Sequence, residues 1–403
     1  MARWRGVCPR ATAERSRRGL TPVCVVLLVL CSCAFGQNVL PNGSFELVEP
    51  PTPTAELAKS GQAAPPDAWL PRTWNLWGQW GAAAKLPDDP AQAHTGARAV
   101  QFAAKQGQCW LRYATLPVPD RQPWTVRFWA RGQGKLSVGA CDATTDQWKH
   151  LPAQTVDVPA QWAELSATWT PPEGCTKWVL DFTNQGATEC FIDDVTLTHP
   201  AFPALALPPT KPLTRDERTL LLLDFEEPLN EDAFYVGGQV AYADEGMPGF
   251  GKVLKLGPEA YVACSADENL SAPRGTVEVW VKLMAPGNNN VGQPFVSVPG
   301  PQGFWLGKNQ YAHVGIGFSS GWGHVSGVTA MGYAGSWQPC WRHVAACWDE
   351  AGMQLFVDGK LIGWQSQPKL LRTVGPELRI GAPGMLLDNL RISDVVRYRV
   401  PTP

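Results

Sequence analysis

Hydrophobic and polar residues alternate along most of this chain, which is the pattern of β-strands with one buried face. In Trp124–Arg131 (WTVRFWAR), Val126, Phe128 and Ala130 fall on one face, and Arg127, Trp129 and Arg131 fall on the other. Gly275–Leu283 (GTVEVWVKL) alternates in the same way. No long segment after residue 36 has apolar residues at helical spacing. The pattern therefore predicts an all-β chain.

The best-defined element is a run of three strands near the C-terminus. Trp341–Trp348 is the first strand, and a turn rich in polar residues leads to the second, Met353–Val357. Asp358 and Gly359 then supply the two φ > 0 positions of a tight type I′ hairpin. Lys360–Gly363 begins the third strand.

This run resembles the signature of laminin-G-like domains, which have the concanavalin A-like lectin/glucanase sandwich. The matching parts are WRHVAACW, LFVDG and, near the end of the chain, LLDNLRI. The resemblance covers residues 219–399 and implies a jelly-roll β-sandwich. In the family pattern Trp341 and Trp348 belong to the core, while such domains bind glycans or proteins.

Residues 37–198 contain about nine short strands, beginning with Gln37–Glu49, which fits a jelly-roll sandwich. Their motifs resemble those of family-four/nine carbohydrate-binding modules, within the galactose-binding-like jelly rolls. The motifs in order are NGSFE, HTG, FWAR, WTPP and FIDDV. The sequence thus predicts two β-sandwiches in tandem, joined by a Pro-rich linker at 199–218.

Residues 1–36 read as a signal peptide with a basic start, an apolar core at Val23–Leu30 and a cleavage site at Ala34–Gly36. We expect the mature chain to begin at Gln37 and to be secreted, extracellular or periplasmic. Lipid attachment at Cys33 is the alternative. No later segment is long and apolar enough to cross a membrane.

Composition limits the partners. The leader holds six arginines and one glutamate, so the net charge of −2 becomes −7 in the mature chain. An acidic chain without basic clusters argues against nucleic acid or an anionic membrane as partner. Seven cysteines remain after the leader; four lie in the first half, where Cys175–Cys190 is the favoured disulfide among three connectivities.

Catalytic motifs are missing from the sequence. Hydrolases of the concanavalin A-like fold need two carboxylates, usually as Glu-x-Asp-x-x-Glu on one strand. That spacing does not occur, and neither does a nucleophile elbow, a phosphate loop or His-Glu-x-x-His. The sequence predicts a protein that is not an enzyme.

Aromatic clusters are candidates for sugar binding, because sugars present C–H faces that stack on aromatic rings. Trp74, Trp77 and Trp80 form one cluster; either they make a stacking platform or one or two of them fill the core. Trp129 suits sugar binding or, as we favour, stacking with its arginine neighbours. In the second half the candidates are Trp305, Trp322 and His324.

Calcium is the candidate cofactor, since each half begins and ends with acids. The resemblance implies that Glu46 and Asp193 hold a structural Ca²⁺ together with carbonyls at 94–98. Neighbouring acids complete the predicted ligand set: Asp194 in the first half, Asp224 and Asp388 in the second. The alternative is that these acids are solvated strand ends.

Together these observations predict a secreted, non-catalytic glycan-binding protein. The alternatives are an extracellular adhesion scaffold that binds a cell-surface protein, and an accessory part of a glycoside hydrolase system. The fold alone does not decide among them.

Overall fold

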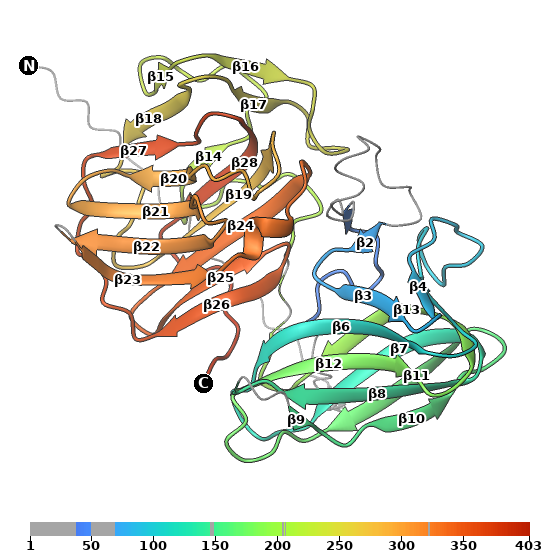
Figure 1. Ribbon diagram of the computed structural model, residues 1–403. Helices are drawn as coiled ribbons and strands as arrows, with labels where there is room; N and C mark the ends of the chain where they lie inside the picture. The colour runs from blue at the N-terminus through green and yellow to red at the C-terminus, as the bar shows by residue number, and fades with distance from the viewer. Residues whose placement is uncertain (1–37, 50–68, 146–148, 204, 206, 321–322) are drawn as a thin grey trace, which may run out of the picture. The chain divides into compact units, whose positions relative to one another are not determined.

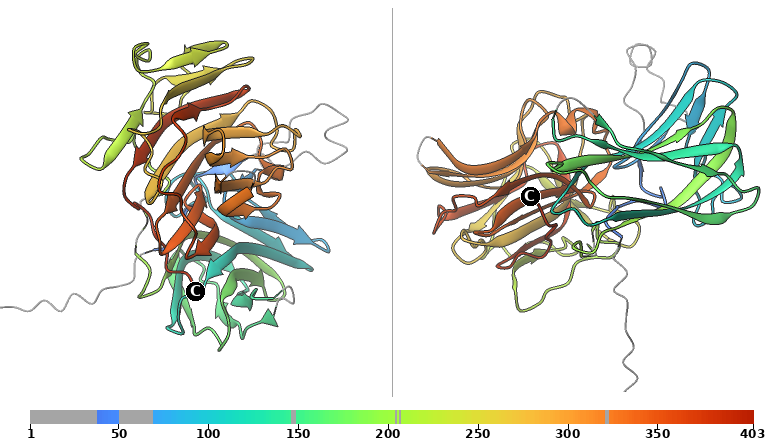
Figure 2. Two further views of the ribbon diagram at one scale, coloured as in Figure 1. Left: turned by 90° about the vertical axis from the view of Figure 1, so that its left-hand side faces the viewer. Right: turned by 90° about the horizontal axis from the view of Figure 1, so that it is seen from below.

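The computed structural model describes residues 38–49, 69–145, 149–203, 205, 207–320 and 323–403. Their strands form two sets that share no sheet, one up to residue 198 and one from residue 219 (Figure 1). Each set is arranged as two layers of antiparallel strands (Figure 2). The predicted all-β class and the β-sandwich fold are confirmed. The signal peptide, its cleavage site and Cys33 lie outside the described residues.

The first sandwich has one sheet in the order β10-β8-β12-β6-β3, with β9 on β8, and a second in the order β11-β7-β13-β5-β4. A small pair, β1-β2, lies beside them. The strands are β1 (Val48–Glu49), β2 (Leu70–Pro71), β3 (Asn75–Gln79), β4 (Ala83–Lys85), β5 (Val100–Ala104), β6 (Gln108–Pro117), β7 (Trp124–Gln133), β8 (Lys135–Asp142), β9 (Lys149–His150), β10 (Gln154–Asp157), β11 (Ala163–Trp169), β12 (Lys177–Asn184) and β13 (Thr188–Thr198).

The core of this sandwich follows the alternation of its strands. Val126, Phe128 and Ala130 on β7 are fully buried, as the sequence predicts. Phe128 meets Phe182 of β12 edge to face, with ring centroids 5.0 Å apart. The two rings come from different sheets, so this contact joins the two layers.

The predicted strand over Gln37–Glu49 is wrong for most of its length. Asn42 and Phe45 have φ of 54° and 58°, which is left-handed backbone that interrupts a strand. The Asn42 carboxamide accepts a hydrogen bond from the Leu47 amide and donates one to the Leu47 carbonyl, each at 2.8 Å. This side chain therefore closes a turn, and the strand is confined to β1.

The Cys175–Cys190 disulfide is also not formed, and the cysteines of the described residues are free thiols. Cys190 lies on β13, whereas Cys175 precedes β12, a strand of the opposite sheet. Burial raises the pKa of the Cys190 thiol to about 12.

The second sandwich has one sheet in the order β16-β17-β28-β19-β24-β25-β26, with β14 on β28, and another in the order β15-β18-β27-β20-β21-β22-β23. The elements are β14 (Thr219–Leu223), β15 (Tyr235–Gly237), β16 (Val240–Ala243), β17 (Val253–Leu256), β18 (Tyr261–Ser265), β19 (Gly275–Leu283), β20 (Gln293–Val298), β21 (Gln302–Lys308), β22 (Val314–Ser320), β23 (Gly323–Ala330), the 3₁₀ helix η2 (Tyr333–Ser336), β24 (Trp341–Trp348), β25 (Gly352–Val357), β26 (Lys360–Ser366), β27 (Glu377–Ile380) and β28 (Met385–Ser393). No helix in the described ranges has the length and hydrophobicity to cross a membrane.

The predicted hairpin is confirmed. Asp358 and Gly359 have φ of 49° and 81°, the two positive values that a type I′ turn requires. On β24, Trp348 is fully buried, and its indole Nε1 donates to the Ala272 carbonyl at 3.0 Å. Its ring contacts Phe304 and Phe318, which belong to the facing sheet.

Trp348→Ala should destabilise the second sandwich by about 3–5 kcal/mol, the usual result of truncating a buried aromatic residue. The measurement is guanidinium unfolding followed by circular dichroism. Trp305→Ala is the matched control, because Trp305 is half-buried and lies on the outward face of β21. A loss in Trp348→Ala no larger than in this control would contradict the core position of Trp348.

Candidate functional site

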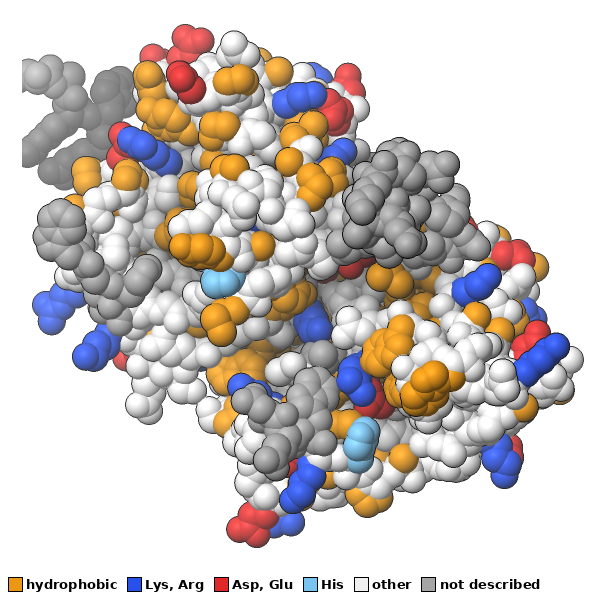
Figure 3. Space-filling view, in the orientation of Figure 1, with side chains coloured by type: hydrophobic (Ala, Val, Ile, Leu, Met, Phe, Trp, Pro, Cys, Tyr) orange, Lys and Arg blue, Asp and Glu red, His pale blue; other side chains and the backbone are white. Residues whose placement is uncertain are grey.

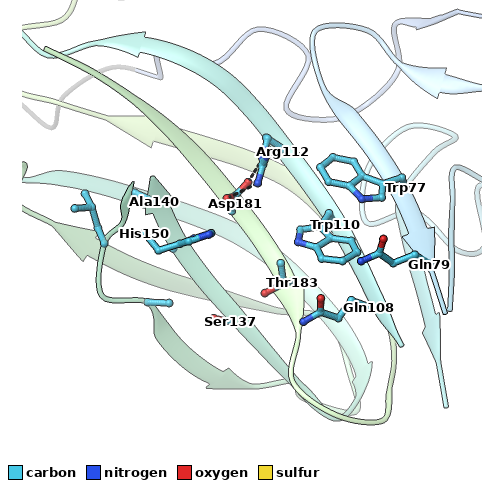
Figure 4. Close-up of a pocket in the computed structure, with 13 residues that line it drawn as sticks. Trp77, Gln79, Gln108, Trp110, Arg112, Ser137, Ala140, His150, Asp181 and Thr183 are labelled. Carbon is cyan, nitrogen blue, oxygen red and sulfur yellow. Dashed lines mark hydrogen bonds and ion pairs between the residues drawn. The ribbon is translucent and has the colours of Figure 1, made fainter. Parts of the chain in front are cut away.

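A groove of about 510 Å³ lies on the outward face of the β10-β8-β12-β6-β3 sheet (Figure 4). On the surface, hydrophobic side chains gather over this sheet next to charged ones (Figure 3). The lining residues are Trp77, Gln79, Gln108, Trp110, Arg112, Ser137, Gly139, Ala140, His150, Leu151, Ala153, Asp181 and Thr183.

The pairing of the strands brings these side chains together. Directly opposed residues of an antiparallel pair point to the same side of the sheet. Trp77 of β3 is opposite Trp110 of β6, and Thr183 of β12 is opposite both Trp110 and Ser137. The next row repeats this arrangement with Asn75, Arg112, Asp181 and Gly139.

Two stacked indoles form one side of the groove. The rings of Trp77 and Trp110 are nearly parallel, at 15°, with centroids 5.4 Å apart. Both are half-buried, so part of each ring is open to a ligand. Trp80, whose side chain is 69% exposed, meets the edge of Trp110 at 6.3 Å. The result is a continuous aromatic surface next to the amide side chains of Gln79 and Gln108 (Figure 4).

A charged pair forms the middle of the groove. The Arg112 guanidinium donates two hydrogen bonds to the Asp181 carboxylate, from Nε at 2.5 Å and from Nη2 at 3.0 Å. The guanidinium also lies 5.3 Å from the centroid of the Trp77 ring. This planar, bidentate pair fixes the donors and acceptors beside the indoles.

At its far end the groove is lined by the His150 imidazole, and the Cys141 thiol is buried next to it. Cys141 Sγ is 3.2 Å from His150 Nδ1 and 3.2 Å from Asp181 Oδ2. Burial, and after it the charge of Asp181, raise the pKa of the Cys141 thiol to about 12. The groove thus changes from aromatic to ionisable along its length.

The structure places the three tryptophans of the predicted Trp74/Trp77/Trp80 platform in different environments. Trp77 lines the groove, and Trp80 borders it. Trp74 is 4% exposed and packs between Phe45 and Tyr113, with centroid distances of 5.5 and 5.2 Å. Trp74 is therefore a core residue, which corrects its place in the ligand-binding set.

Trp129 lies on β7, in the sheet opposite the groove. Its ring stacks on the His94 imidazole at 3.8 Å and 12°, so part of its face is already covered. The structure does not bring Trp129 together with Trp77 or Trp110.

Of the three candidates of the second half, the structure describes the side chain of Trp305 alone. Trp305 is half-buried on β21, and its ring lies against Gly315, where an added Cβ would come within 2.9 Å of it. Trp322 lies outside the described residues. His324 is placed by its backbone, which pairs with Ser319, and its side chain is outside the description.

The predicted calcium ligands of the first half hold one loop. Glu46 Oε1 accepts hydrogen bonds from the amides of Ala97 at 2.8 Å and Arg98 at 3.0 Å. Asp193 Oδ2 accepts from the amides of His94 at 2.8 Å and Thr95 at 3.1 Å. Burial raises the pKa of Asp193 to about 7. The loop donors therefore occupy oxygens that a cation would need.

Asp194, the remaining predicted ligand in this half, bonds to the same loop. Its carboxylate contacts His94 Nδ1 at 2.6 Å and accepts from the Thr95 hydroxyl at 2.7 Å.

The acids of the second half form a different environment. Asp388 is fully buried; its Oδ1 accepts from the Asn389 amide group at 2.8 Å, whereas Oδ2 has no hydrogen-bond partner among the described atoms. Burial raises the pKa of Asp388 to about 7, and the charges of Glu226 and Asp224 add to this. A buried oxygen without a donor near two more acids fits a bound cation.

Sequence reasoning missed most of the groove, including Trp110, Arg112, Asp181 and His150. The alternation of β6 contains a usable signal, because Gln108, Trp110 and Arg112 occupy its outward positions. The partner strands of β6 do not follow from that pattern.

A protein-family model matches most of the second sandwich. Residues 256–397 match the laminin G type model of the concanavalin A-like lectin/glucanases superfamily. This match confirms the resemblance predicted for that part of the chain. No curated protein matches the chain.

Among solved structures, the chain is similar to TmCBM61 in complex with β-1,4-galactotriose, with 19% identity, a TM-score of 0.27 and coverage of 40% of this chain and 99% of that one. It is also similar to domain 4 of AbnA, a GH43 extracellular arabinanase from Geobacillus stearothermophilus, in complex with arabinotriose. Here the identity is 15%, the TM-score is 0.34, and the match covers 44% of this chain and 93% of that one. A third similar structure is the botulinum neurotoxin serotype D binding domain, with 13% identity and a TM-score of 0.35. The match covers 44% of this chain and 49% of that one.

Gly96→Ala should destabilise the first sandwich by about 1–3 kcal/mol. Gly96 has φ of 67°, and an added Cβ would lie 2.2 Å from Glu46 Oε1, the atom that holds the loop. Thermal unfolding measures the effect. Gly174→Ala is the control, because Gly174 has φ of 80° but no atom within 4 Å of the added Cβ. Equal losses in the two variants would show that the contact with Glu46 contributes nothing.

Proposed function

We propose that this protein binds glycan chains without cleaving them, through the groove on the first sandwich. The observation that supports this most strongly is the stacked pair Trp77 and Trp110 beside the Arg112–Asp181 pair. The indoles match the C–H face of a sugar ring, and the adjacent polar groups match its hydroxyls. The groove volume of about 510 Å³ is within the usual range of ligand sites.

The acids of the groove support binding rather than hydrolysis. Glycoside hydrolysis uses two carboxylates on either side of the bond that breaks. Asp181 is the one carboxylate among the described lining residues, and Arg112 holds both of its oxygens. The groove itself offers no second acid for the reaction.

Export and the action of the two sandwiches in tandem belong to the same proposal. Residues 1–36 direct export, the two sandwiches act in tandem, and engagement of one glycan by both raises the apparent affinity. On the second sandwich, Trp305 is the proposed sugar contact. Adhesion to a cell-surface protein is the competing function.

Trp77→Ala and Trp110→Ala should each weaken binding to the recognised polysaccharide about tenfold, since an aromatic contact is worth roughly 1 kcal/mol or more. A glycan array on the mature chain identifies the ligand class, and affinity electrophoresis then measures the change. Trp129→Ala is the matched control on the opposite sheet. Equal loss in all three variants would contradict the groove as the binding site. A blank array from folded protein would favour protein adhesion.

We also propose that calcium supports the fold. The ligands would be Asp388 and Asp224 in the second sandwich, where Asp388 Oδ2 is buried without a partner. In the first sandwich Glu46, Asp193 and Asp194 are the ligands, which requires the loop at 94–98 to turn carbonyls toward the ion. Each carboxylate would supply hard oxygen ligands.

Calcium should raise the unfolding temperature relative to a chelator, because an ion that binds only the folded state adds about 2.7 kcal/mol at a hundredfold excess over its Kd. Differential scanning calorimetry measures this. Asp388→Asn should abolish the response of the second sandwich, while Glu46→Gln tests the first. Identical transitions with calcium and with chelator would refute the calcium proposal and leave the glycan groove untouched.

A further inference from the structure

The ionisable end of the groove combines three different metal-binding side chains. Cys141, His150 and Asp181 come from β8, β9 and β12, three strands of one sheet. One ligand atom from each residue lies within 4.8 Å of the other two. Within the described residues, this is the group of histidine, cysteine and acidic side chains that meets that condition.

We propose that Cys141 Sγ, His150 Nδ1 and Asp181 Oδ2 bind a divalent zinc-type ion, with the fourth coordination position open to the groove. His150 is exposed and, like Asp181, lines the groove, so an ion and a water ligand can reach the site (Figure 4). Three protein ligands with one open position is the arrangement of zinc sites that accept a ligand.

The distances fit a tetrahedral ion. Zinc takes sulfur at about 2.3 Å and nitrogen or oxygen at about 2.0–2.2 Å, so two ligands of a tetrahedral site lie about 3.5 Å apart. The measured separations from Sγ to Nδ1 and to Oδ2 are both 3.2 Å. The atoms of these two pairs need to move apart by only a few tenths of an ångström.

The chemistry of the ligands selects the kind of metal. A thiolate and an imidazole favour zinc and its neighbours in the transition series, whereas calcium and magnesium prefer oxygen alone. The thiolate and the carboxylate together balance a charge of +2. This set differs from the oxygen-only acids at the strand ends, so the two proposed ions require different ligands.

Arg112 orients the acid from the other side. Its Nη2 donates to Asp181 Oδ2 at 3.0 Å, the oxygen that also lies 3.2 Å from the thiol. Its Nε donates to Oδ1, the oxygen that the ion would leave free. A hydrogen bond of this kind to the second oxygen of a carboxylate is typical of the outer shell of metal sites. The pairing of β8 with β9 and β12 holds the backbones of all three ligands.

The competing explanation is a hydrogen-bond chain without an ion. In that arrangement the Cys141 thiol donates to Asp181, and an N–H at His150 Nδ1 donates to the sulfur. The same distances would result, so metal binding has to be measured directly.

The test is Zn²⁺ titration of the metal-free mature chain in competition with a chromophoric chelator. Cobalt(II) then serves as a probe, because a cysteine ligand gives a thiolate-to-cobalt charge-transfer band in the near ultraviolet. We expect one ion per chain at this site. Cys141→Ser and His150→Gln should weaken binding by about a hundredfold or more, since changes in the outer shell alone cost about 10–100-fold.

Two variants separate the site from other causes. Cys175→Ser removes another buried thiol of the same sandwich and should bind zinc like the unmodified chain. Because His150 is exposed, His150→Gln tests the site even if Cys141→Ser fails to fold. If the unmodified chain takes up no zinc, or if His150→Gln binds as well as Cys175→Ser, the hydrogen-bond chain is correct and the proposal is wrong.

Discussion

The register between β6 and its neighbours is the constraint on which the groove depends. It places Trp110 opposite Trp77 on one side and Thr183 on the other, and it sets Arg112 against Asp181. A shift of one residue would send these side chains into the core and bring Leu111 and Tyr113 to the surface. Burial of Leu111 and Tyr113 therefore fixes the register of β6, and the same register places the groove residues on the outward face.

Sequence patterns predicted the features that depend on neighbouring residues and missed those that depend on strand pairing. The hairpin at Asp358–Gly359 and the buried face of β7 depend on neighbouring residues, and the structure confirms both. Trp74 and Trp77 look alike in sequence, yet only strand pairing decides which one is buried. The first predicted strand failed because the Asn42 side chain replaces backbone partners, an effect that periodicity does not register. The groove required five strands, β3, β6, β8, β9 and β12, which span more than a hundred residues of the sequence.

The two sandwiches share a local backbone arrangement at their first and last strands, although the strand order of their sheets differs. Phe45 and Phe225 both have φ of 58°, and each precedes a glutamate whose Oε1 accepts from a loop amide. In each final strand a buried aspartate precedes a left-handed residue, Asp194 or Asn389. The first sandwich satisfies its buried acid with amides, whereas the second leaves Asp388 Oδ2 without a donor.

The Arg112 side chain has a consequence for cooperativity. It lies over Trp77 and is bonded to Asp181, so it contacts an indole of the proposed glycan site and a carboxylate of the proposed ion site. If one ligand moves this guanidinium, it changes the free energy of binding of the other. Thermodynamic linkage makes this effect reciprocal: the factor by which an ion alters glycan affinity equals the factor by which the glycan alters ion affinity. One arginine would thus make the groove a coupled two-ligand receptor.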